Sequence, residues 1–287
     1  MMNSATFSFN VLHDLKNMWQ YDFMRHAFEA GTVVAIVAGV IGYFVVLRRS
    51  AFAAHALSHI GFAGAAGAVL LGISPFLGLL AFTSAGGVAM AALGRKAASR
   101  DVQIGTVLAF MLGLGVLFIS LYSGYATEAY SLLFGEILGI SSADVLMTAI
   151  AGLILLATVV AIYRPLLFSS LDEEVAEAKG VPVTRLGVAF MLLLAVATSM
   201  AVQVVGILLI FALMVTPAAV AQRIALRPAQ GVVLSVITAL LATWLGLFIS
   251  FYLPYPVSFF ITSVTFVIYV AVRLIPCGSG SSQGPWG

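Results

Sequence analysis

The fold class of this chain follows from the run of residues 185–222, which reads RLGVAFMLLLAVATSMAVQVVGILLIFALMVTPAAVAQ. After Arg185 it contains no charged side chain, and it is nearly twice as long as the roughly 20 apolar residues that cross a bilayer as one helix. Gln203 and Gly206 lie near its middle, where a polar residue and a flexible residue indicate a break. The run therefore predicts two membrane-spanning helices, at about 185–203 and 204–222.

The composition of the whole chain agrees with a membrane protein. Of 287 residues, 62% are apolar and 8% are charged, and the mean hydropathy is +1.13. A soluble domain is about a quarter charged, so these values exclude a soluble globular protein, a disordered chain and a nucleic-acid binder. Long unbroken apolar runs, rather than alternating segments of about ten residues, favour helices over a transmembrane barrel. The predicted fold class is all-α and polytopic.

Seven further apolar runs accompany the two in 185–222. They lie at roughly 31–47, 52–72, 76–93, 103–122, 144–163, 229–251 and 256–275. Together the runs predict nine transmembrane helices, or eight if the first run does not fully cross. Residues 129–140 are too short to span and are expected to form a short helix or a re-entrant piece packed on protein.

The basic residues indicate the orientation in the membrane. Eleven of the 13 lysines and arginines follow the first, third, fifth and seventh runs or end the ninth: Arg48, Arg49, Arg95, Lys96, Arg100, Arg164, Lys179, Arg185, Arg223, Arg227 and Arg273. Cytoplasmic loops carry an excess of Lys and Arg, so these sites are expected to face the cytoplasm, with the N-terminus outside and the C-terminus inside.

The two ends of the chain differ from the single transmembrane domain expected over residues 31–275. Residues 1–30 mix aromatic and charged side chains, which argues against a cleavable signal. Within them, 7–24 suit an amphipathic helix in the membrane interface or a solvated lead-in. Residues 276–287 are rich in Gly and Ser and are expected to be a flexible tail. The single cysteine, Cys277, excludes a disulfide framework.

A pair of histidines lies inside the predicted helix 52–72. His55 and His59 are four residues apart and share one helix face, so both imidazoles can reach one divalent ion. They lie roughly 10–15 Å from the arginine end of the helix, at a depth where ionisable groups are costly. Position 56 is Ala, so the glutamate of the zinc-protease motif is absent and hydrolysis is excluded. The alternative is two neutral histidines bonded to backbone carbonyls or to Ser58.

Glu136 is the third ionisable candidate. It lies in the short segment 129–140, where a carboxylate could line a cavity in the membrane. The alternative is an interfacial acid at a helix end.

The hydrophilic stretch 169–182 predicts a short helix on the cytoplasmic face. Ser169 or Ser170 can cap it, acidic residues fill its first turn, and Gly180 can end it. It is either a solvated connector or a docking helix for a cytoplasmic partner. Its expected apolar side consists of Leu171, Val175 and Ala178.

Several stretches in this order resemble a known family. They are residues 42–52 (GYFVVLRRSAF), 56–59 (ALSH), 133–139 (LFGEILG), 172–181 (DEEVAEAKGV), 205–210 (VGILLI), 216–221 (TPAAVA) and 246–250 (GLFIS), followed by Pro254 and Pro256. Between about residue 23 and residue 275 the chain resembles the membrane permease subunit of the ABC importers for zinc, manganese and iron(II).

The resemblance implies a passive permease rather than an enzyme, multi-pass in the bacterial cytoplasmic membrane. Two copies would form a homodimer around a central path, and an extracytoplasmic metal-binding protein would deliver the ion. The sequence has no G-x-x-x-x-G-K-[ST] phosphate loop, so a separate cytoplasmic ATPase dimer would supply the energy. That dimer would grip the helix near 170–180, through Leu171, Asp172, Glu173, Glu174, Val175, Ala178 and Gly180.

The resemblance also implies where the metal passes. The membrane site of the family uses an acid and a histidine four residues apart; His59 matches the histidine, and His55 stands where the family has the acid. Glu136 is carried over as a third metal residue. Imidazole suits zinc better than manganese, so the expected cargo is zinc first, then manganese or iron(II), with no permanently bound cofactor.

Two other functions compete with this interpretation. In a stand-alone proton-coupled carrier or channel, His55, His59 and Glu136 would form a proton relay. An intramembrane enzyme is disfavoured, because the sequence offers no serine–histidine or paired-aspartate arrangement. The acidic cytoplasmic helix favours the ABC permease over the stand-alone carrier, because a stand-alone carrier has no need of a docking surface.

Overall fold

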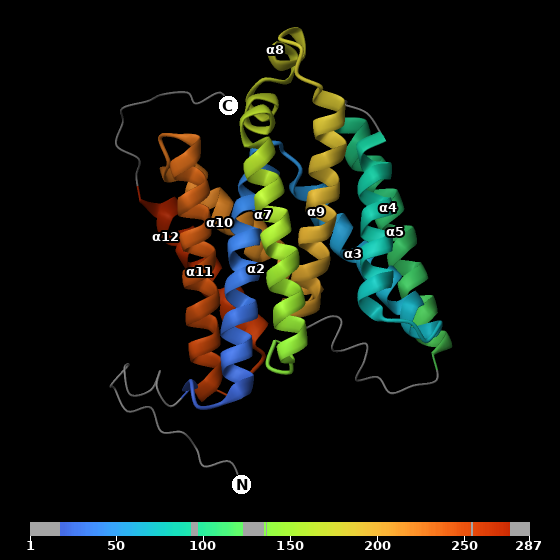
Figure 1. Ribbon diagram of the computed structural model, residues 1–287, viewed down its shortest axis with the longest axis vertical. Coiled ribbons are helices and arrows are strands. Elements are labelled where there is room, and N and C mark those ends of the chain that lie inside the picture. The colour runs from blue at the N-terminus through green and yellow to red at the C-terminus, as the bar shows by residue number, and fades with distance from the viewer. Residues whose placement is uncertain (1–17, 93–96, 123–134, 136, 254, 276–287) are drawn as a thin grey trace.

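The computed structural model describes residues 18–92, 97–122, 135, 137–253 and 255–275, and they fold into helices (Figure 1). The helices are α2 (Asp22–Leu47), α3 (Ala51–Leu70), α4 (Pro75–Ala92), α5 (Ala97–Leu121), α7 (Ser142–Leu171), α8 (Glu173–Ala178), α9 (Val183–Val205), α10 (Ile207–Ile224), α11 (Pro228–Tyr252) and α12 (Val257–Leu274). No strand occurs among these residues. The predicted all-α, polytopic fold class is confirmed.

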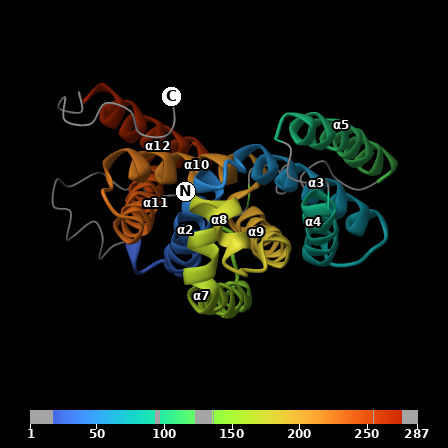
Figure 2. The ribbon, with the colours of Figure 1, turned by 90° about the horizontal axis from the view of Figure 1, so that it is seen from above.

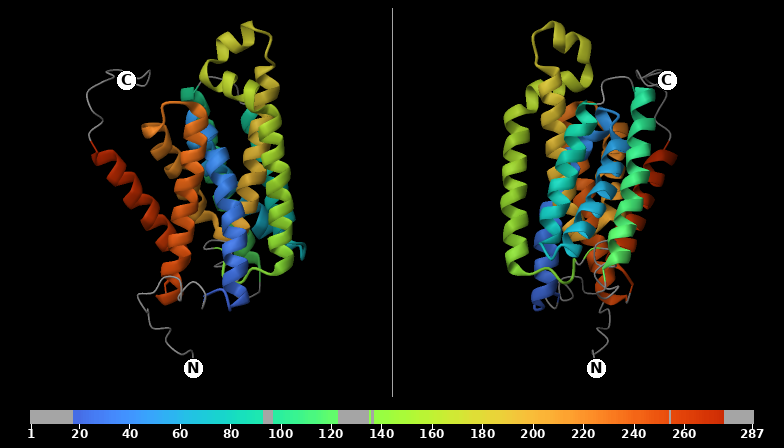
Figure 3. Two further views of the ribbon diagram at one scale, coloured as in Figure 1. Left: turned by 60° about the vertical axis from the view of Figure 1, so that its left-hand side comes forward. Right: turned by 90° about the vertical axis from the view of Figure 1, so that its right-hand side faces the viewer.

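The long helices run side by side and reverse direction from one to the next (Figures 1 and 3). Within the described ranges, eight are long and apolar enough to cross a membrane: α2, α3, α4, α5, α7, α9, α11 and α12. α10 contains a shorter apolar stretch, Leu209–Ile224. As a helix, α10 has 18 residues, the same length as α4 and α12. The first run lies in α2, which with 26 residues is one of the longest helices.

The predicted break in the run 185–222 is present. α9 ends at Val205 and α10 begins at Ile207, with Gly206 between them at φ +82°. This positive φ favours glycine, since a side chain there would crowd the backbone.

One end of the bundle collects most of the described basic residues, and we call it the basic end. α8 forms its tip (Figure 1). The described residues at this end are Arg48, Arg49, Arg164, Lys179, Arg185, Arg223, Arg227 and Arg273. Arg25, in the first turn of α2, lies at the opposite end. This segregation agrees with the orientation expected from the sequence, in which the basic end faces the cytoplasm.

α2 lies at the centre of the bundle, packed against α7, α9, α10 and α11. Seen from above, α3, α4 and α5 lie to one side of it and α11 and α12 to the other (Figure 2). α9 packs against α4 and α3 on one side and against α2 on the other, so it joins the first group to the centre of the bundle.

Small residues let α3 and α4 approach closely. A Cβ added at Gly64 would overlap the backbone carbonyl of Gly78, and a Cβ at Gly78 would overlap that of Gly64. Gly61 lies against Thr83 of α4, and Gly67 lies against Phe118 of α5. The small-residue side of this helix therefore serves tight packing within one chain.

α2 begins earlier than its apolar run predicted. The helix starts at Asp22, inside the expected N-terminal segment 1–30. Arg25 pairs with Asp22 at 3.1 Å, and Glu29 is exposed, while Met24 and other apolar residues of these turns are buried. The extra turns are thus helical because one face packs on the protein while the polar face stays outside.

Some predictions concern parts of the chain outside the described residues. These are most of the helix expected at 7–24, the tail 276–287, the basic residues Arg95 and Lys96, and residues 129–134 and 136 of the short segment.

Candidate functional site

The histidine pair lies on α3, a helix that is largely buried. Most side chains of α3 from Ala53 to Ala68 are buried, but both His55 and His59 are partly exposed. Their ring centroids are 4.7 Å apart and the ring planes meet at 84°. The helical spacing therefore brings the two imidazoles into contact on one open face, as predicted.

This spacing fits a shared ion. Two imidazoles that bind one tetrahedral zinc ion through bonds of about 2 Å have centroids roughly 5 Å apart. The Ser58 hydroxyl donates to the backbone carbonyl of His55 at 2.7 Å, one turn back along its own helix. Among the described residues, neither imidazole of the pair has a hydrogen-bond partner. The alternative of two histidines bonded to carbonyls or to Ser58 gains no support from these contacts.

An aromatic side chain from α10 adjoins the pair. The ring of Phe211 lies 5.2 Å from that of His55, at 74°, and is 39% exposed. The sequence offered no signal for this contact, because Phe211 is one of many large apolar residues in a continuous run. The contact places the first turns of α10 beside the candidate metal site.

Glu136 lies outside the described residues, but its neighbour Gly135 does not. Gly135 has φ +75°, and a Cβ there would overlap the backbone of Val205 and Gly206. Phe211 is five residues beyond Gly206, about 7.5 Å along α10. Gly135 therefore lies at the α9–α10 junction, at the start of the helix whose Phe211 contacts His55.

Within one copy of the chain, His55 and His59 supply two nitrogen ligands for a metal ion. The described part of the chain holds no group of three or more His, Cys, Asp or Glu side chains that could bind a metal ion. A zinc ion in a protein takes four ligands, or three with an open position. Further ligands must come from water, from residues outside the described ranges or from another molecule.

α8 is present, but its cap differs from the prediction. Asp172 is the N-cap, and its Oδ1 accepts from the Val175 amide at 2.9 Å. Ser169 and Ser170 lie instead in the last turn of α7, where both hydroxyls donate to the Leu166 carbonyl. The expected serine cap is wrong because α7 continues through Pro165 to Leu171. Gly180 follows the helix at φ +80°, which matches the predicted end.

α8 displays the residues expected to dock a partner. Leu171 is 54% exposed and Val175 is 45% exposed, while Ala176 faces inward. The other predicted docking residues are also exposed: Asp172, Glu173, Glu174, Ala178 and Gly180. The tip of the basic end thus combines apolar and acidic side chains on one small protruding helix.

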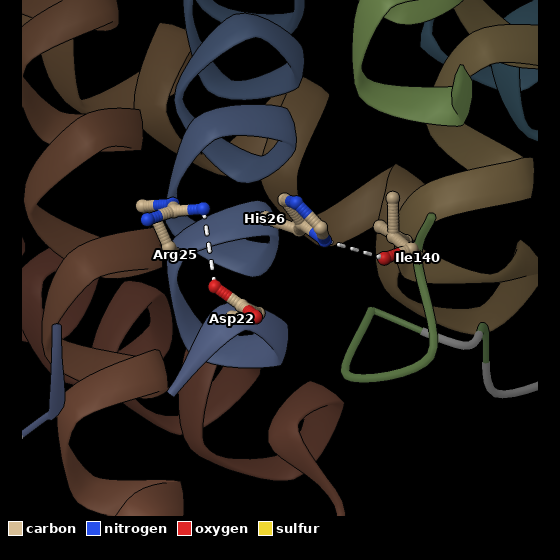
Figure 4. Close-up of polar contacts among 4 residues, drawn as sticks. All are labelled: Asp22, Arg25, His26 and Ile140. Carbon is tan, nitrogen blue, oxygen red and sulfur yellow. Dashed lines mark hydrogen bonds and ion pairs between the residues drawn. The ribbon is translucent and has the colours of Figure 1, made fainter. Parts of the chain in front are cut away.

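A third histidine has a structural contact at the opposite end. His26 Nδ1 lies 3.2 Å from the carbonyl oxygen of Ile140, and because a carbonyl only accepts, this nitrogen is the donor (Figure 4). The bond ties α2 to the loop before α7. His26 is therefore distinct from the pair on α3.

A bundle of membrane-crossing helices with a short exposed helix at its basic end is the architecture of a multi-pass membrane protein. The chain belongs to the ABC 3 transport family, whose model matches residues 20–275. It is accordingly a permease of the ABC transporter class in a bacterial membrane, as the sequence predicted.

Three relatives illustrate the family. The manganese transport system membrane protein MntC of Listeria monocytogenes is 34% identical over 238 residues, 83% of this chain and 85% of the relative. The high-affinity zinc uptake system membrane protein ZnuB of Haemophilus influenzae is 28% identical over 80% of this chain and 88% of its own length. The solved structure of PsaBC from Streptococcus pneumoniae in complex with Fab matches with a TM-score of 0.83 and 28% identity, covering 92% of this chain and 96% of that chain.

Proposed function

We propose that this chain is the permease subunit of an ABC importer for a divalent transition-metal ion, zinc first and manganese second. The observation that carries the proposal is the contact between the His55 and His59 rings on the open face of α3. Relatives named for manganese transport and for zinc uptake support the substrate class. The transported ion is cargo, so the site must bind it well enough to dehydrate it and weakly enough to release it.

The donor chemistry supports zinc ahead of manganese. The pair offers two imidazole nitrogens, whereas manganese prefers carboxylate and other oxygen ligands. Because some relatives are named for manganese transport, manganese is the second proposed cargo of this chain.

A second copy of the chain would complete the site. Two copies facing each other across the exposed side of α3 would place four imidazoles around one path, enough for a tetrahedral zinc ion. Four nitrogens in one fixed geometry would hold the ion too tightly for transport. Separation of the two pairs during the transport cycle would lower the affinity and release the ion.

α8 is the proposed docking site for a separate ATPase subunit, through its exposed Leu171 and Val175 and the acidic residues between and beside them. An extracytoplasmic metal-binding protein would deliver the ion at the opposite end. The runner-up, a stand-alone proton-coupled carrier that uses His55 and His59 as a relay, leaves the exposed apolar side chains of α8 without a role.

Uptake of radiolabelled zinc and manganese tests the proposal. The permease would be expressed with its neighbouring ATPase and metal-binding protein in cells that lack their own importers, intact or as His59→Ala. His26→Ala is the matched control, since it removes an imidazole that lies away from the pair.

We expect zinc uptake to fall to background in His59→Ala and to persist in His26→Ala. Unchanged uptake in His59→Ala would assign the histidines to packing and reject the proposed metal path. Uptake that continues without the ATPase would favour the carrier.

A further inference from the structure

We propose that Arg48 is a positioning residue that passes the movement of α8 to α3, the helix that carries the histidine pair. The inference rests on the proposed function, because it concerns how a docked ATPase would act on the metal site. It is drawn from contacts of Arg48 that link the α2–α3 turn to the end of α7.

The turn between α2 and α3 is short and closely hydrogen-bonded. The Arg49 amide donates to the Val46 carbonyl at 3.1 Å, and the Ser50 amide donates to the Val45 carbonyl at 2.8 Å. Arg49 has φ +52°, a left-handed conformation that residues other than glycine rarely adopt. α3 begins at Ala51, so a displacement of Arg48 is passed directly to the first turn of α3.

His55 lies one helical turn beyond Ala51, about 6 Å along the axis. A tilt or shift of the start of α3 therefore moves the imidazole ring of His55 relative to its surroundings. The ring of His55 would then move relative to the ring of Phe211 on α10, which it contacts.

The guanidinium of Arg48 reaches the residues that lead into α8. Its Nη1 donates to Ser170 Oγ at 3.1 Å and to Ser169 Oγ at 3.3 Å, and both serines belong to the last turn of α7. Asp172, the N-cap of α8, follows two residues later. The same guanidinium lies over the ring of Phe190 of α9, with Cζ 5.2 Å from the ring centroid.

A cavity of about 480 Å³ lies between the turn and the base of α8. Its walls include Arg48 and Ser50 of the turn, Leu171 and Glu173 at α8, and Thr184 and Met191 of α9. α8 packs against α7 and α9, and this space separates it from α3. Arg48 thus links the α2–α3 turn to the end of α7 at the wall of this space.

Arginine suits this role better than lysine. Its planar guanidinium can donate to two hydroxyls while its face stacks on an aromatic ring, whereas an ammonium group has N–H donors but no planar face to stack. Arg48→Lys therefore keeps the positive charge but loses the stacking on the ring of Phe190.

The test measures how many zinc ions are transported per ATP hydrolysed. The complete complex of permease, ATPase and metal-binding protein would be reconstituted in liposomes, with hydrolysis and labelled zinc uptake measured in parallel. The variants are Arg48→Met, Arg48→Lys and the double variant Ser169→Ala with Ser170→Ala. The matched control is Arg223→Met, which removes an arginine at the same end that donates to the Arg273 carbonyl at 3.1 Å and links α10 to α12.

We expect zinc transported per ATP to fall about tenfold in Arg48→Met, in the range of coupling lost along such contacts, with a smaller loss in the other two variants. Arg223→Met should keep the wild-type ratio. An unchanged ratio in Arg48→Met overturns the inference, even if hydrolysis and uptake fall together. If that variant does not assemble, the serine double variant decides, and an unchanged ratio there also overturns it. Absence of zinc and manganese uptake by the wild-type complex would reject the proposed function instead.

Discussion

The imidazole ring of His55 stands edge to face against that of His59, with 4.7 Å between the centroids. The contact requires only the helical spacing of the two residues, but its exposure depends on how α3 packs. Both rings are partly exposed, whereas the other side chains of α3 from Ala53 to Ala68 are buried. Under the proposed function, one ion would reach both rings from outside the chain.

Replacing one imidazole by a carboxylate should change the metal preference. We expect His55→Asp to raise the ratio of manganese to zinc uptake several-fold, about one order of magnitude at most, because oxygen donors favour manganese. Competition between the two labelled ions in cells measures this ratio. His55→Asn is the control: it removes the imidazole without adding a charge, and we expect it to lower uptake of both ions. A His55→Asp ratio equal to that of the native chain would argue against direct ligation by residue 55.

Metal uptake should fall in acid. An imidazole must be neutral to bind a metal, and an ordinary histidine takes up its proton at about pH 6.5. Below that pH protons compete with the ion, so we expect uptake to drop about tenfold between pH 7.5 and pH 5.5. Initial rates of labelled zinc uptake at constant ATP report this effect. A flat profile over the same interval would speak against histidine ligation.

Disruption of the exposed face of α8 should abolish transport. Glu173→Ala combined with Val175→Asp removes one exposed acid and places a charge on an exposed apolar position. We expect uptake to fall more than about tenfold, because a charge in the apolar centre of an interface costs several kcal/mol. Co-purification with the ATPase should be lost while zinc binding to the purified permease is kept. Arg227→Ala, at an exposed position of the same end, is the control, and normal uptake in the α8 variant would favour the stand-alone carrier.

The packing of α3 on α4 predicts a difference between two glycine substitutions. A Cβ at Gly64 would overlap the backbone of Gly78, whereas a Cβ at Gly113 of α5 meets nothing within 4 Å. We expect Gly64→Ala to destabilise the protein by about 1–3 kcal/mol, the usual cost of overpacking, and Gly113→Ala to have little effect. Thermal unfolding in detergent compares them, and equal midpoints would contradict the close approach.

Most of the helices were predictable because a membrane makes hydropathy a local signal. The runs, the break at Gly206 and the segregation of basic residues to one end depend on residues close in sequence. The errors lie at helix ends. α2 begins before its apolar run because one face of its polar turns packs on protein, and Asp172 rather than a serine caps α8 because α7 continues past Pro165.

Local sequence patterns were enough to predict the class of protein, the helical architecture and the pairing of His55 with His59, since helix periodicity alone brings residues four apart together. The groups that surround that pair depend on how the helices pack in three dimensions. Phe211 reaches His55 from a different helix, and Arg48 reaches Ser169 and Ser170 across more than a hundred residues. Contacts of this kind depend on the mutual packing of whole helices, which no local pattern encodes.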